Sequence, residues 1–91
     1  MQVIAEIVKD TSNVIITDHA QEKMIERGIT AVQILKCLKN GRIIEGPYRE
    51  TRGNWKMNIN CFSAGEPLTV VVVLDNQGNG NLTIVITAYN G

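Results

Sequence analysis

The sequence has few residues that bind metals and lacks the patterns that mark phosphate loops. It holds one histidine and two cysteines in 91 residues. Cys37 and Cys61 are 24 positions apart, and neither a CxxC nor an HExxH pattern occurs, so we expect no metal site. Glycine-rich phosphate loops and Ser or Cys nucleophile motifs are also missing. We therefore expect no cofactor, and we place both cysteines in the core.

Long apolar runs are missing as well. The longest, Val70 to Leu74, has five residues, whereas a membrane-spanning helix needs roughly 18. The first ten residues, MQVIAEIVKD, include acids and lack a basic segment, which argues against a signal peptide. Two cysteines without an export signal are typical of a reducing compartment. We therefore expect a cytoplasmic protein that does not contact a membrane.

The sequence also lacks an excess of positive or negative charge. Nine basic and nine acidic side chains give a net charge of zero, which excludes a strongly basic nucleic-acid binder. The charges are unevenly placed, however, because residues 36–56 hold six basic and two acidic side chains. Such a segment can steer an anionic partner even when the total is zero. Ordinary surface charge is the alternative.

The apolar pattern predicts one α+β domain over residues 1–91, with 44% hydrophobic residues and no linker or repeat. Helical spacing and caps predict three helices, over 2–10, 18–27 and 30–40. From Arg42 the period becomes two, which predicts strands over 42–45, 54–62, 68–75 and 82–89. Short connections favour an antiparallel meander. We expect N-terminal helices packed on one face of a roughly four-stranded antiparallel sheet.

Two of these strands should present polar residues on one face. In 54–62, Lys56, Asn58 and Asn60 alternate with apolar residues. In 82–89, alternation predicts one face of Leu82, Ile84, Ile86 and Ala88, and another of Thr83, Val85, Thr87 and Tyr89. If helices cover the apolar faces, these polar side chains line an open surface, and Arg49 and Arg52 lie in the loop that leads to it. A solvated face without function is the alternative.

A basic row marks the helix predicted over 18–27. His19, Lys23 and Arg27 follow one another at intervals of four residues, which places them on one helix face. His19 lies in the first turn, where the helix dipole favours the neutral imidazole that can accept a proton. Arg27 can pair with a phosphate through two nitrogens. The alternative is local neutralisation by Glu22 and Glu26.

The segment TDHAQEKMIERGIT, with a following helix and strands ending in Thr-x-Tyr, resembles a small bacterial domain family of unknown function. Its members commonly read His-Ala-x-x-Arg-x-x-x-Arg-Gly-Ile. That family is similar to RelE-like toxins of the barnase–EndoU–colicin–RelE group of RNase folds. Some members resemble toxin halves of toxin–antitoxin pairs, beside an antitoxin with a zinc ribbon. The resemblance covers residues 15–90 and implies a RelE-like fold.

Matched by position, the resemblance implies a catalytic set at His19, Arg27, Thr87 and Tyr89. Lys23 stands where arginine is usual, so the charge is kept but the planar fork is lost. The resemblance and the residue patterns together predict substrate contacts at basic and polar positions, namely Lys23, Arg49, Arg52, Lys56 and Asn58.

Two functions follow as hypotheses. The first is a metal-independent endoribonuclease toxin, with His19 as the base and Arg27, Arg52 and Lys56 stabilising the charge on the phosphate. The second is a non-catalytic toxin-like domain that binds a partner protein, with a strand edge at 42–45 or 82–89 available for pairing. RNA and an antitoxin protein are the corresponding partners. The sequence predicts no oligomeric state.

Overall fold

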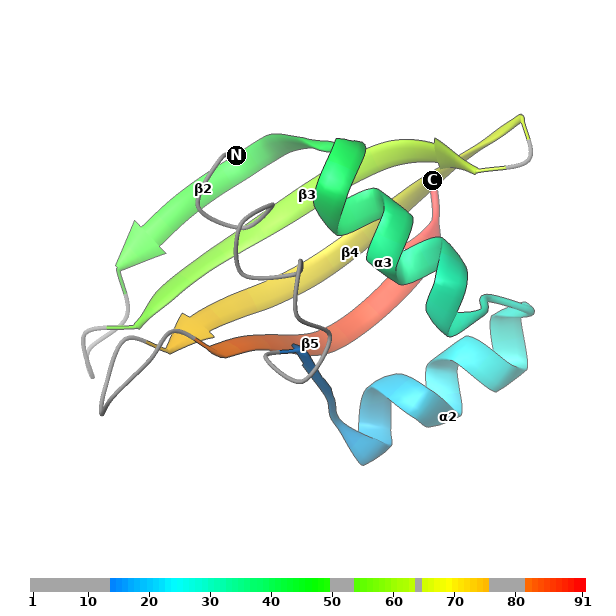
Figure 1. Cartoon of the computed structure of the whole chain (residues 1–91), viewed down its shortest axis with the longest axis horizontal. Helices are drawn as coiled ribbons and strands as arrows, with labels where there is room; N and C mark the ends of the chain where they lie inside the picture. The colour runs from blue at the N-terminus through cyan, green and yellow to red at the C-terminus, as the bar shows by residue number, and fades with distance from the viewer. Residues whose placement is uncertain (1–13, 50–53, 64, 76–81) are drawn as a thin grey trace.

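The computed structural model describes residues 14–49, 54–63, 65–75 and 82–91 of the chain (Figure 1). The predicted helix over 2–10 and the predicted contact Arg52 lie outside these ranges. The elements, in chain order, are β1 (Val14–Ile16), α2 (Asp18–Arg27), α3 (Ala31–Asn40), β2 (Arg42–Arg49), β3 (Trp55–Ser63), β4 (Glu66–Asp75) and β5 (Leu82–Asn90).

The strands form one mixed sheet in the order β1-β5-β4-β3-β2. Strands β2 to β5 are the predicted antiparallel meander. The prediction of four antiparallel strands is wrong in one respect, because β1 adds a fifth strand, parallel to β5. Three β-branched residues are too few to show a period, so the sequence alone did not distinguish a strand from a helix entry here.

Both helices begin and end at the residues that the caps predict. The Thr17 hydroxyl accepts a hydrogen bond from the Ala20 amide at 3.1 Å and begins α2. Gly28, with φ of 67°, ends it in the left-handed conformation that glycine tolerates best. Thr30 and Gln33 form a reciprocal capping box at the start of α3. These caps fix the short turn between the two helices.

The helices cover one face of the sheet, as predicted. In Figure 1, α3 lies across β3 and β4, and α2 lies alongside β5. The core between these layers consists of small and medium apolar side chains, namely Ala20, Met24, Ile29, Ile34, Cys37, Leu38, Met57, Ile59, Leu68, Val70, Val72, Leu74, Val85 and Ala88. The helix layer therefore buries one face of the meander and leaves the other face without a covering helix among the described residues.

A bulge in β5 changes which face its side chains occupy. Val72 pairs with Val85, but Val71 pairs with Thr87, so Ile86 is an extra residue in the ladder. The predicted alternation is therefore wrong for the first half of the strand. Thr83 and Val85 are fully buried, and Val85 belongs to the core under the helices. After the bulge, Ala88 faces the core as predicted.

The edges of the sheet differ from the predicted ones. β2 is longer than the predicted strand over 42–45, because it continues to Arg49, with one register shift before Glu45 and a second across Gly46 and Pro47. β5 is not a free edge along its first half, because β1 pairs with Thr83 to Val85. That part of the strand cannot accept a partner strand, contrary to the second hypothesis. In the described part of the chain, no helix is long and apolar enough to span a membrane.

Candidate functional site

The face of the sheet opposite the helices carries most of the predicted polar side chains. Register partners in neighbouring strands point to the same face. One row runs from Asn58 through Val71 to Thr87. The next row runs from Asn60 through Thr69 to Tyr89. Asn58, Thr87 and Tyr89 therefore share one face, which we call the open face.

Two hydrogen-bond clusters hold the polar groups of the open face. Asn60 Nδ2 donates to Thr69 Oγ1 at 3.0 Å, and both side chains bond to the carbonyl of Gly91. On the β2 side, Asn58 Nδ2 donates to Glu45 Oε2 at 3.2 Å, and the Tyr48 hydroxyl donates to Glu45 Oε1. The Glu45 carboxylate also raises the pKa of the Tyr48 phenol. An anion on this face would meet Glu45 beside Asn58.

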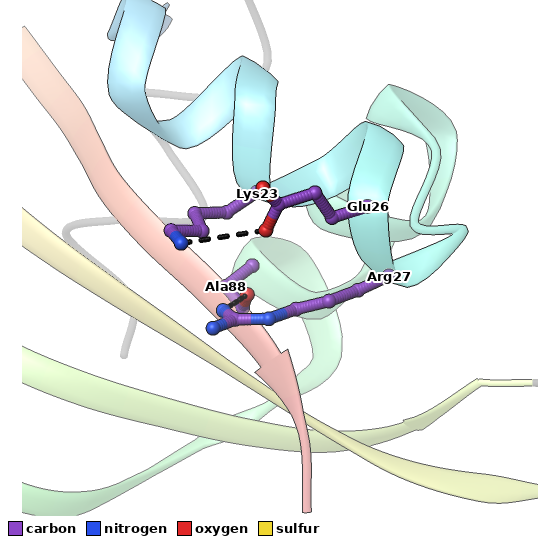
Figure 2. Close-up of polar contacts among 4 residues, drawn as sticks. All are labelled: Lys23, Glu26, Arg27 and Ala88. Atoms are coloured by element: carbon purple, nitrogen blue, oxygen red, sulfur yellow. Dashed lines mark hydrogen bonds and ion pairs between the residues drawn. The ribbon is translucent and has the colours of Figure 1, made fainter.

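Arg27 is the basic residue that the fold places beside the two β5 candidates. Its Nη1 donates to the carbonyl of Ala88 at 2.6 Å (Figure 2). Ala88 stands between Thr87 and Tyr89 in β5, so the guanidinium lies at the backbone that joins them. Asn90 Nδ2 donates to the Arg27 carbonyl at 3.4 Å, which adds a second tie between α2 and β5. Arg27 thus meets the β5 backbone between Thr87 and Tyr89, whose side chains point to the open face.

The other members of the basic row follow α2 away from this point. Lys23 projects toward β5 and forms an exposed ion pair with Glu26 at 3.3 Å (Figure 2). His19 is exposed in the first turn of α2. It precedes Arg27 by two helical turns, which separates their backbones by roughly 12 Å along the axis. The same spacing separates His19 from the contact between Arg27 and Ala88.

The remaining basic candidates do not gather at one point. Lys56 is exposed on the open face, where its register partners are Tyr48 and Val73. Arg49 pairs with Trp55, on the helix side of the sheet, and its guanidinium lies 5.5 Å from the centre of the indole ring. The structure thus separates Arg49 from Lys56, which sequence reasoning had grouped.

An apolar pocket beside α2 was missed by sequence reasoning. It is open to solvent, has a volume of about 380 Å³ and is lined by Ile16, Gln21, Met24, Ile25, Ile29 and Ala31. Ile25 is 83% exposed and Val32, which follows Ala31, is 61% exposed. The sequence did contain a signal for this pocket, because Ile25 and Val32 are large apolar side chains at helix positions that lie outside the predicted core. Within the described ranges, no group of three or more His, Cys, Asp or Glu side chains is placed to hold a metal ion.

Residues 16–90 match the model of a family described as a domain of unknown function (DUF4258). The match covers most of the chain, from the end of β1 to the end of β5, and the chain belongs to this family. Neither a curated protein nor a solved structure matches the chain.

Proposed function

We propose that the protein is a metal-independent endoribonuclease with a RelE-like fold, the toxin of a toxin–antitoxin pair. The observation that carries the proposal is the bond from Arg27 to Ala88. It ties a guanidinium to the β5 backbone between Thr87 and Tyr89, at the end of a helical row that contains the only histidine of the sequence. The other nitrogens of a guanidinium remain available to a phosphate, because its fork carries five donors.

RNA would follow the basic row of α2, pass the edge of the sheet at the end of β5 and extend over the open face. His19 removes the proton of a 2′-hydroxyl, and that oxygen attacks the adjacent phosphorus atom. The bond from phosphorus to the 5′-oxygen breaks, and that oxygen takes a proton from water, which leaves a 2′,3′-cyclic phosphate and a 5′-hydroxyl. Lys23, one turn from His19, stabilises charge on the reacting phosphate, because its exposed pair with Glu26 is weak enough to exchange. Arg27 and Lys56 bind neighbouring phosphates.

The first prediction concerns His19. Purified protein should cleave single-stranded RNA in the presence of EDTA and leave cyclic phosphate ends. His19→Ala should lower the cleavage rate by about a hundredfold or more, as expected for loss of a general base. Product ends analysed by mass spectrometry, together with the rate, measure this effect.

Glu22→Ala is the matched control, because Glu22 is an exposed residue on the same helix outside the basic row. It should cleave at the wild-type rate. Equal rates for wild type and His19→Ala, or cleavage that stops with EDTA, would contradict the mechanism.

A second candidate function rests on the apolar pocket beside α2. Ile25, at 83% exposure, borders a cavity that an apolar side chain of another protein can fill. In this reading the domain is non-catalytic and binds a partner protein. The salt dependence of binding separates the two functions, because phosphate contacts release counterions and apolar burial does not.

A further inference from the structure

Two cysteine side chains meet between α3 and the sheet. The Cys37 thiol lies 3.8 Å from the carbonyl of Ile59 in β3 and 3.8 Å from the carbonyl of Leu68 in β4. Cys61 is the register partner of Leu68 and lies two residues after Ile59 on the same face. The Cys37 sulfur thus lies between the two backbone groups that flank Cys61. Both cysteines are free.

Only one of these thiols is open to solvent. Cys37 is fully buried. Cys61 is half-buried and lines a pocket of about 210 Å³ with the polar side chains of Gln33, Lys36, Asn40 and Ser63. The Gln33 amide donates to the Ser63 hydroxyl at 2.8 Å, which holds one wall of the pocket in place. A small polar reagent can therefore reach Cys61 but not Cys37.

The environment of Cys37 keeps its proton in place. Burial raises the pKa of the Cys37 thiol, and the hydrogen bond and charge of the adjacent Cys61 raise that pKa further. Cys37 therefore stays a neutral thiol near neutral pH. The pair combines an accessible sulfur, which can react first, with a protected one behind it.

We propose that Cys61 and Cys37 form a peroxide-sensitive pair, in which Cys61 is oxidised first and Cys37 resolves it. The Cys61 sulfur attacks one oxygen of a hydroperoxide, an S–O bond forms, the O–O bond breaks, and the alcohol or water leaves. The Cys37 thiol then gives its proton to the departing hydroxyl as its sulfur attacks the sulfenic sulfur, so that water leaves and no free Cys37 thiolate is formed. One disulfide forms and one hydroperoxide is reduced. The step is independent of RNA binding.

The test uses the whole protein and hydrogen peroxide. The wild type should lose two hydrogens in intact mass, fail to react with a thiol alkylating reagent, and yield one Cys37–Cys61 cross-linked peptide. Dithiothreitol should reverse all three effects. The melting temperature should rise on oxidation, because a disulfide that joins α3 to β3 restricts the unfolded chain.

Single variants establish the order of reaction. Cys37→Ser should gain one oxygen at Cys61 that a sulfenic-acid reagent traps. Cys61→Ser should keep an unmodified Cys37 under the same treatment. Two free thiols in treated wild type, oxidation of Cys37 in Cys61→Ser, or a disulfide between two copies of the chain would each overturn the proposal. The wild-type measurements stand without the variants, so a variant that fails to fold does not affect them.

Discussion

Arg27 combines a structural contact with its proposed role toward RNA. Its hydrogen bond to Ala88 joins residues that are 61 positions apart in the chain. A charged donor on a carbonyl contributes to stability, and its removal leaves that carbonyl without this partner. Loss of RNA cleavage in an Arg27 variant would therefore combine a loss of stability with a loss of phosphate binding. His19, exposed in the first turn of α2, is the cleaner position for a test of mechanism.

The buried Cys37 thiol predicts a loss of stability in alkali. Its pKa in the folded protein is raised above the ordinary value of 9.0. The folded state then holds a proton that the unfolded chain releases. The contribution of Cys37 is therefore fully present below pH 9.0 and declines above it, by about 1.4 kcal/mol per pH unit. Urea unfolding between about pH 8 and 10.5, with reductant present, measures the slope.

Cys37→Ala provides the comparison for that slope. The variant loses some packing at every pH, but its free energy of unfolding should decline less steeply above pH 9.0 than that of the wild type. Parallel curves for the two proteins would show that another group causes the alkaline loss.

At the scale of elements, two helix ends depend on glycine for different reasons. Gly28 has a positive φ and open space around it, so Gly28→Ala should cost about 1 kcal/mol through its backbone alone. A Cβ at Gly41 would lie 2.5 Å from the Cys37 carbonyl and 2.7 Å from the Ile59 side chain. Gly41→Ala should cost about 2 kcal/mol, because α3 must move away from β3. Chemical denaturation measures both costs.

Asparagine separates the two causes. Asn tolerates the left-handed conformation, so Gly28→Asn should recover part of the loss seen with alanine. Gly41→Asn adds more atoms to a filled space and should be worse than Gly41→Ala. The reverse order at either position would contradict the assigned cause.

The strands show where sequence patterns stop being informative. In β3, alternation predicted the faces correctly, since Met57 and Ile59 are buried and Lys56 is exposed. In β5 it failed before the bulge at Ile86, because both alternating sets were apolar or β-branched and either could face the core. Only the ladder with β4 determines where the extra residue lies. Long-range contacts such as Arg27 to Ala88 are invisible to spacing for the same reason.

For the whole molecule, the two described helices, the meander and the caps followed from local patterns, because each has a short-range cause. Much of the open face followed too, since Asn58, Thr87 and Tyr89 share it. The parallel strand β1 did not, and neither did the apolar pocket. Both depend on how distant segments of the chain pack together, and local sequence patterns do not reveal that packing.

The zero net charge makes salt dependence the discriminating measurement for the whole protein. If the chain binds RNA, its affinity for a single-stranded RNA should fall steeply with added salt. Lys56→Ala should weaken binding and reduce the magnitude of the log–log slope by about 0.7, the value for one lost phosphate contact on a single strand. Fluorescence anisotropy across a salt series measures both.

Lys39→Ala is the matched control, because Lys39 is an exposed lysine at the end of α3. It should keep the wild-type slope. Ile25→Asn should leave RNA affinity unchanged. An affinity for RNA that does not change with salt concentration, or that is lost in Ile25→Asn, would favour the partner-binding function over the RNase function.

The arrangement at the two sheet edges has a consequence for polymerisation. Past Val85, where β1 ends, α2 runs beside β5, and Arg27 occupies the carbonyl of Ala88. On the far side, β2 is interrupted by Pro47, which has no amide hydrogen, and by two register shifts. Among the described residues, neither edge offers a long regular ladder with which a second sheet could pair. Strand addition at these described edges would therefore find few backbone groups in register, which disfavours growth of a continuous sheet from copy to copy.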